Sequence, residues 1–185
     1  RQITDGFIKE DLGMLHKAES TMRRKREELK NSRRKEMIGF RKIDPEVAME
    51  KNTWFHLGRN SCEEILYCLR RIADPCEEHV DNNFVPLSKE QVKEYIPLRD
   101  TVLFLLRRTE KILQTDSYDE VDEVRREAEE LKDCLEKARE AQMQRMQSSK
   151  ENIAVAYLYL NLLQETRELT SSLRHLLRAS KGFRE

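Results

Sequence analysis

The sequence predicts an all-α protein, an antiparallel bundle of about five long helices, and three observations support this prediction. Charged residues make up 38% of the 185 residues, whereas Gly and Pro occur only five and four times. Apolar residues recur at spacings of three and four, and no segment shows the alternating pattern of a strand. The length suits one domain with its own core. We expect this domain to span residues 1–185 in two loosely related halves, about 5–84 and 88–182.

The first two expected helices lie in the first half of the chain. One runs from Asp5 to about Asn31, because apolar residues there fall near heptad spacing. The other begins at Asp44, which can cap a helix, followed by Pro45, whose missing N–H is tolerated in the first turn. This helix runs to about Asn82. Its inward-facing residues are expected to be Phe55, Gly58, Cys62, Ile65, Leu69, Ile72, Cys76 and Val80.

The segment "DNNFVPLSKEQ" (residues 81–91) separates the two halves. Its asparagines favour a helix end, and its proline prevents the helix from continuing. Its serine, three residues before the glutamine, forms a capping box that opens the third helix. That helix runs to about residue 114, and Pro97 inside it predicts a kink.

The fourth and fifth expected helices complete the second half. Ser117 with Glu120 forms another capping box, and the fourth helix ends near Ser148. Its inward-facing stripe is Val121, Val124, Ala128, Leu131, Leu135 and Ala138. The fifth helix runs from about residue 149 to residue 180. Its expected inward-facing residues are Tyr157, Leu160, Leu163, Leu173 and Leu177.

Charges of opposite sign are concentrated in two segments, although 35 basic and 35 acidic residues give a formal net charge of zero. The overall balance argues against a dedicated nucleic-acid binder. Residues 20–42 hold ten Lys or Arg against three Glu, a local +7, and residues 116–140 hold five basic against eleven acidic residues, a local −6. Two alternatives remain open. The two faces attract each other, within a chain or across a homodimer, or the basic one contacts anionic lipid or phosphate.

Several classes of protein lack support in the sequence. There is no Gly-rich phosphate loop, nucleophile elbow or zinc-protease motif, so we do not expect an enzyme. The longest apolar run, Ile153–Leu163, is too short to span a bilayer, and no signal peptide is present. Four cysteines without a CxxC pattern indicate reduced thiols in a cytosolic protein. Because the chain starts at Arg1 rather than Met, we expect a fragment of a larger protein.

The acidic stretch "RRIADPCEEHVDNNF" (residues 70–84) is the main candidate site. Its helical carboxylates form two pairs at a spacing of four, so that each pair projects from one face. The residues are Asp74 with Glu78 and Glu77 with Asp81. Clustered carboxylates bind hard and borderline metal cations, and His79 would add a nitrogen ligand. The alternative is an ordinary solvated helix end, in which Arg70 pairs with Asp74.

This stretch and two further segments resemble a known family. The segments are "IKEDLGMLHKAE" (residues 8–19) and "YLYLNLLQETRELTSSLRHLLRAS" (residues 157–180). Together the three resemble, in order and over nearly the whole chain, the PhoU-like C-terminal domain of bacterial sodium/phosphate cotransporters common in Bacteroides. The resemblance implies a regulatory bundle of two related halves on the cytoplasmic side of the inner membrane, where it influences phosphate uptake. It implies the membrane-embedded transporter portion of the same polypeptide as partner, and a divalent or iron-type metal ion as a possible cofactor.

The resemblance also implies a metal motif, an acidic residue followed four positions later by Asp, once in each half. Here Arg70 and Asp74 occupy the first motif, and Asn161 and Glu165 occupy the second, so each half keeps one carboxylate of two. The implied metal ligands are therefore Asp74 and Glu165, together with the nearby Glu77, Glu78 and Asp81. The two halves relate at an offset of 91 residues, which matches Cys62, Ile65, Leu69 and Ile72 to Ile153, Ala156, Leu160 and Leu163.

Overall fold

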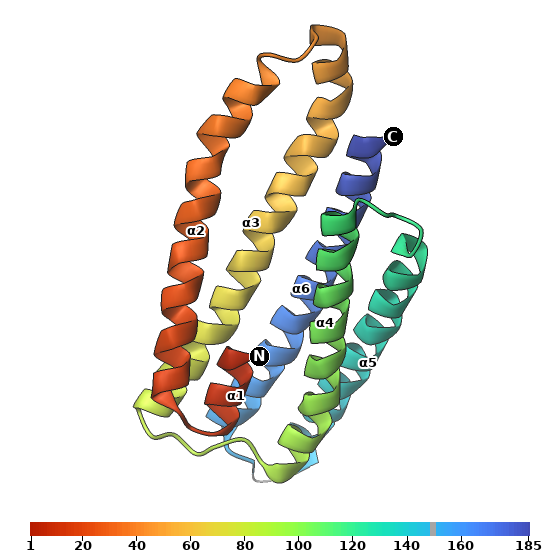
Figure 1. The fold of residues 1–185 in the computed structure, drawn as a ribbon. Helices are drawn as coiled ribbons and strands as arrows, with labels where there is room; N and C mark the ends of the chain where they lie inside the picture. Colours follow the sequence, from red (N-terminus) through yellow and green to blue (C-terminus); the bar gives the residue numbers. More distant parts are fainter. Residues whose placement is uncertain (149–150) are drawn as a thin grey trace.

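The computed structural model describes residues 1–148 and 151–185, without the side chains at 34, 37, 40 and 148, and within them it has six helices and no strand (Figure 1). The helices are α1 (Gln2–Ile8), α2 (Leu12–Phe40), α3 (Pro45–Asp81), α4 (Lys89–Thr115), α5 (Val121–Ser148) and α6 (Ile153–Arg184). The prediction of an all-α bundle is confirmed. The five helices after α1 are long, from the 27 residues of α4 to the 37 residues of α3.

The first expected helix is two helices, so the prediction of one continuous helix from Asp5 is wrong. α1 ends in a left-handed turn, in which Glu10 has φ 54° and the Asp11 N–H donates to the Gly6 carbonyl at 2.8 Å. The Asp11 side chain then accepts a hydrogen bond from the Met14 N–H at 3.0 Å. A Cβ on Gly6 would lie 3.0 Å from the Met14 Cβ, so glycine lets the two helices approach closely at this turn.

The same prediction also ended too early, because α2 continues past Asn31 to Phe40. No Gly or Pro occurs between residues 31 and 38 to break the helix. Arg59 on α3 ties this part of α2 to its neighbour. Its guanidinium donates to the Leu29 carbonyl at 2.8 Å and forms an ion pair with Glu36.

The packing of the helices follows the same scheme in the two halves of the chain. α1 packs on α2 and α3, and α2 packs on α3; in the same way α4 packs on α5 and α6, and α5 packs on α6. α3 and α6 pack against each other and join the halves at the centre of the bundle (Figure 1). The chain therefore forms two three-helix units of like connectivity, α1–α3 and α4–α6.

Capping interactions define the connection between the two units. α3 ends beside Asn83, which has φ 51°, and the Phe84 N–H donates to the His79 carbonyl at 3.1 Å. Ser88 and Gln91 form the predicted capping box at the start of α4, with hydrogen bonds of 2.9 and 3.1 Å. The predicted break between the second and third expected helices is confirmed.

The starts of α3 and α5 differ in how well the sequence predicted them. Asp44 caps α3 as expected, accepting a hydrogen bond from the Glu46 N–H at 2.9 Å. At α5 the Glu120 carboxylate instead accepts from Arg108 on α4 at 3.0 Å, and the helix begins at Val121. A charge-assisted bond to a guanidinium is stronger than a bond to a backbone amide, so it draws Glu120 away from the predicted capping box.

The core of the α4–α6 unit follows the predicted apolar stripes with one exception. All six stripe residues of α5 are buried, and α6 buries Leu163, Leu173 and Leu177 as predicted and half-buries Leu160. The prediction for Tyr157 is wrong, because this residue is 63% exposed. Tyr159 is buried in its place, and its hydroxyl donates to Glu94 at 2.8 Å. The expected start of this helix at residue 149 lies outside the described residues.

Beyond the core, α2 and α3 extend as a two-helix arm, which we define as residues 19–60. Ala18 is the last buried residue of α2 among the side chains that the structure describes. The predicted inward face of α3 is buried at Ile72, Cys76 and Val80, but it is only half-buried at Phe55, Gly58, Cys62, Ile65 and Leu69. Trp54 anchors the arm on α6, where a Cβ on Gly182 would lie 2.6 Å from the indole ring.

Candidate functional site

The four predicted ligands on α3 lie on one helix face but make separate contacts. The Asp74 carboxylate accepts from Arg70 Nε at 2.9 Å, which confirms the expected local ion pair. Glu77 lies 3.2 Å from the Nε2 atom of His16 on α2. Glu78 and Asp81 are exposed to solvent.

The fifth predicted ligand, Glu165, lies on α6 and pairs with Arg71 on α3. Its carboxylate accepts from Arg71 Nε at 2.7 Å, and its side chain is only 10% exposed. The guanidinium also donates to Glu64 at 3.1 Å, and Asn161 donates to the Arg71 carbonyl at 3.2 Å. Hydrogen bonding to Glu165 raises the pKa of Arg71 above its ordinary value. Both second-motif positions therefore face α3, at the seam between the two units.

The acidic residues predicted as metal ligands either pair with basic side chains or are exposed to solvent. Within residues 1–148 and 151–185, no group of three or more His, Cys, Asp or Glu side chains is arranged to hold a metal ion. His79, the expected additional ligand, is buried, with Nε2 at 2.8 Å from the Val85 carbonyl oxygen. Its ring packs edge-on against Phe7 and Phe84, so it fixes the end of α3 and does not join the carboxylates. Metal binding by the five acidic residues stays a prediction.

A groove of about 440 Å³ lies between α2 and α3, along the arm and the next turns of α3 as far as Asp74. Six basic and four acidic side chains line it, so its charge is only partly compensated. Arg23 pairs with Glu19 at 2.7 Å, whereas Arg26, Lys30 and Arg33 make no ion pair in the described part of the chain. The groove therefore favours anions over cations.

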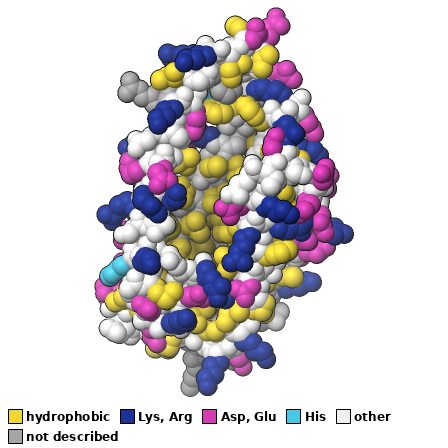
Figure 2. All heavy atoms as spheres, in the orientation of Figure 1, with side chains coloured by type: hydrophobic (Ala, Val, Ile, Leu, Met, Phe, Trp, Pro, Cys, Tyr) yellow, Lys and Arg dark blue, Asp and Glu magenta, His cyan; other side chains and the backbone are white. Residues whose placement is uncertain are grey.

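A second groove, of about 330 Å³, is apolar and lies where the arm meets α6. Figure 2 shows the front of the molecule hollowed between α2 and α4, with hydrophobic side chains on the floor. The residues that line this groove are Leu29, Glu36, Trp54, Phe55, Gly58, Arg59, Cys62, Tyr118, Leu176, Ala179, Ser180 and Phe183.

At the end of the bundle opposite the arm, buried polar groups satisfy one another. Gln91 donates to Gln142 at 3.2 Å and to Glu151 at 2.9 Å, and Gln142 donates to Glu151 at 2.8 Å. Both glutamines are fully buried, so these bonds stabilise the contact between the starts of α4 and α6 and the end of α5. The partners lie as far as 60 residues apart in the sequence, so no local sequence pattern could predict these hydrogen bonds.

The cysteines offer no reactive group in the core. All four are free, and burial raises the pKa of the Cys68 thiol to about 12. A thiol with this pKa stays protonated at neutral pH and is a poor nucleophile. Cys134, by contrast, is exposed on α5.

A scan of known families, a search of curated proteins and a search of solved structures each find no match to this chain. None of the helices in the described residues is both long enough and apolar enough to cross a membrane.

Proposed function

We propose that this chain is the cytoplasmic regulatory domain of a sodium-dependent phosphate transporter, built on the PhoU-like plan and without a catalytic step. The observation that carries the proposal is the like connectivity of the two three-helix units, which a domain of two related PhoU-like halves would have. The three segments at residues 8–19, 70–84 and 157–180 add the sequence resemblance.

Regulation would act through the seam between the two units. A ligand or a membrane-embedded partner shifts a conformational equilibrium only if it binds one arrangement better than the other. α3 and α6 meet through apolar packing together with the Arg71–Glu165 ion pair, which fixes one helix against the other. A partner that docks on one unit would therefore change the position of the other through this seam.

The test measures uptake of radiolabelled phosphate by the full-length transporter in membrane vesicles with an imposed sodium gradient. We expect deletion of residues 1–185 to leave transport in place but to remove its down-regulation at high phosphate. Arg71→Met should weaken the down-regulation, and Arg70→Met, whose ion pair is exposed and local, should leave it unchanged.

Two outcomes would contradict the proposal. One is a reading frame ahead of Arg1 that encodes no apolar segment of about 20 residues, because such a protein would have no transporter portion. The other is phosphate regulation that is the same with and without residues 1–185.

A second function, a self-associating helical scaffold, is favoured by the positions of the charged faces. α2 and α5 lie on opposite sides of the bundle, and the ion pairs of α5 in the described residues reach α4 and α6 rather than α2 (Figure 1). The basic segment (residues 20–42) and the acidic segment (residues 116–140) therefore make no ion pair with each other within the described residues, so any pairing between them would be across a homodimer. Ionic pairing weakens with salt, so such a dimer should dissociate at high salt in size-exclusion chromatography, and a monomer at low salt would end this alternative.

A further inference from the structure

The free end of the arm exposes large apolar side chains to solvent. We define the arm tip as residues 35–51, which join α2 to α3. Among the side chains that the structure describes at the tip, four apolar ones are exposed, namely Ile38 at 48%, Ile43 at 42%, Val47 at 45% and Met49 at 83%. Exposed apolar residues that gather at one projecting point, rather than singly over the surface, mark an interaction site.

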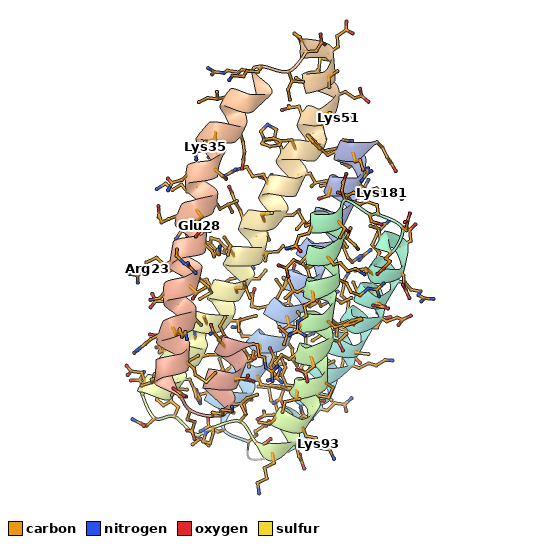
Figure 3. All side chains as sticks on the ribbon, viewed as in Figure 1. Arg23, Glu28, Lys35, Lys51, Lys93 and Lys181 are labelled. Carbon is orange, nitrogen blue, oxygen red and sulfur yellow. The ribbon has the colours of Figure 1, made fainter. Side chains whose placement is uncertain are left out.

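Basic side chains surround these apolar residues. Lys35, Arg41, Lys42 and Lys51 make no ion pair within the described residues. Figure 3 shows Lys35 pointing away from the bundle on α2 and Lys51 near the start of α3, while Figure 2 shows basic and hydrophobic groups side by side at this end. The tip also has four acidic residues. Glu36 pairs with Arg59 and Asp44 caps α3, whereas Glu46 and Glu50 remain.

The basic surface continues from the tip along α2 and includes the groove between α2 and α3, which Arg26, Lys30 and Arg33 line. Arg24, Arg26, Lys30 and Arg33 are exposed and lack an ion pair among the residues that the structure describes. The arm carries little of the core, so that it can approach a large flat surface without unfolding the bundle. The positive surface would bind an anionic partner, and the exposed apolar side chains would be buried by a partner that has an apolar region.

We propose that the arm tip binds the surface of an anionic lipid membrane. Ile43, Val47 and Met49 enter the headgroup region, while Lys35 and Lys42 contact the lipid phosphates. An anionic membrane is the partner that satisfies both sets of groups, because basic residues are attracted to its surface and apolar ones insert at its interface. A nucleic acid would satisfy only the charges and would leave the exposed apolar side chains without a partner. This inference does not depend on the transporter link.

The test is co-sedimentation of the purified chain with vesicles. Vesicles of phosphatidylcholine alone are compared with vesicles that contain about 30% phosphatidylglycerol, at about 50 mM and about 500 mM salt. We expect binding to the anionic vesicles at low salt, at least about tenfold weaker binding to the neutral ones, and loss of most binding at high salt.

Matched variants locate the surface. Lys35→Glu with Lys42→Glu should weaken binding at least about 25-fold, since each basic residue near an anionic surface contributes about fivefold. The control, Lys89→Glu with Lys93→Glu, makes the same change in charge at the opposite end of the bundle and should bind as the unchanged chain does (Figure 3). Ile43→Ser with Met49→Ser keeps the charge and should weaken binding about tenfold. Circular dichroism confirms that each variant remains helical.

Three results would overturn the proposal. The first is an absence of binding to anionic vesicles at low salt, and the second is equal loss of binding in the tip and control charge variants. The third is binding to a short RNA duplex as tight as binding to the vesicles and unaffected by the two serine substitutions, which would indicate a general polyanion surface. Vesicle binding by the purified chain is measured independently of phosphate uptake by the transporter. The membrane proposal and the transporter proposal can therefore fail separately.

Discussion

One substitution, Gly→Ala, should have opposite effects at two helix ends of this protein. In Gly182→Ala on α6, the new methyl group would lie 2.6 Å from two carbons of the Trp54 ring and 2.9 Å from a third. Carbon atoms in good contact lie about 3.5–4.0 Å apart, so the indole ring has to move by about 1 Å or rotate. In Gly39→Ala, near the end of α2, no described atom beyond the neighbouring residues and backbone of the same helix lies within 4 Å of the new methyl group.

The expected energies follow from these distances. Alanine is favoured over glycine by about 1 kcal/mol in a helix interior, and we take about 0.5 kcal/mol here because both positions are in a last turn. Overpacking a contact costs about 1–3 kcal/mol. Gly39→Ala should therefore stabilise the protein by about 0.5 kcal/mol, and Gly182→Ala should destabilise it by about 1 kcal/mol. For a chain of this size, these changes raise Tm by about 1–2 °C and lower it by about 2–4 °C.

Thermal unfolding and tryptophan emission check both expectations. Trp54 is the single tryptophan of the chain, so its emission reports this contact alone. We expect Gly182→Ala to shift the emission to the red as the ring leaves α6, and Gly39→Ala to leave it unchanged. If Gly182→Ala were as stable as Gly39→Ala with the same emission, Trp54 would not pack on α6 and our account of how the arm is anchored would be wrong.

Three further predictions concern the ion pair between α3 and α6, the buried cysteine and tyrosine side chains, and the carboxylates of α3. Arg71→Met should lower the free energy of unfolding, measured by urea titration, by about 1–2 kcal/mol. This is less than the cost of breaking a fully buried ion pair, because the Arg71 side chain is 37% exposed. In the same titration Arg70→Met should have little effect. Burial raises the pKa of both Cys68 and Tyr95 to about 12 and also raises the pKa of Cys76, so their contribution to stability is complete below pH about 8.5 and declines above it as the unfolded chain ionises. Urea unfolding under reducing conditions should show a loss of at least about 2 kcal/mol between pH 8 and pH 10, and a flat profile would contradict this burial. If the α3 carboxylates bind a metal ion, manganese, iron or zinc should raise Tm and Asp74→Ala should remove the gain, while no shift with any of the three would end the metal prediction.

The parts of the fold that the sequence predicted depend on interactions within one or two helical turns. Asp44 caps α3, and the capping box of Ser88 and Gln91 opens α4, because each needs partners only two or three residues away. The Arg70–Asp74 pair was predicted on the same ground. The early break at Glu10 was missed because a left-handed residue other than glycine or asparagine gives little sequence signal.

The candidate site could be predicted only in part. A spacing of four placed the α3 carboxylates on one face, but it gave no information on the helix opposite. Glu165 entered as a metal ligand through the family resemblance, whereas the structure places it against Arg71, 94 residues away. The free, exposed basic residues of the arm were visible as a local charge of +7, and only the structure showed that exposed apolar side chains accompany them at the tip.

The sequence by itself determined the helical class, the position of the break between the two halves and the inward stripe of α5. These features follow from backbone hydrogen bonding and side-chain periodicity, which act locally. The tertiary structure decided that Tyr159 and not Tyr157 is buried, that Trp54 packs on Gly182, and that α3 meets α6 through an ion pair. Each of these depends on how far a helix is rotated about its axis against its neighbours. That rotation is set by the packing of all six helices together, and no single segment of the sequence carries it.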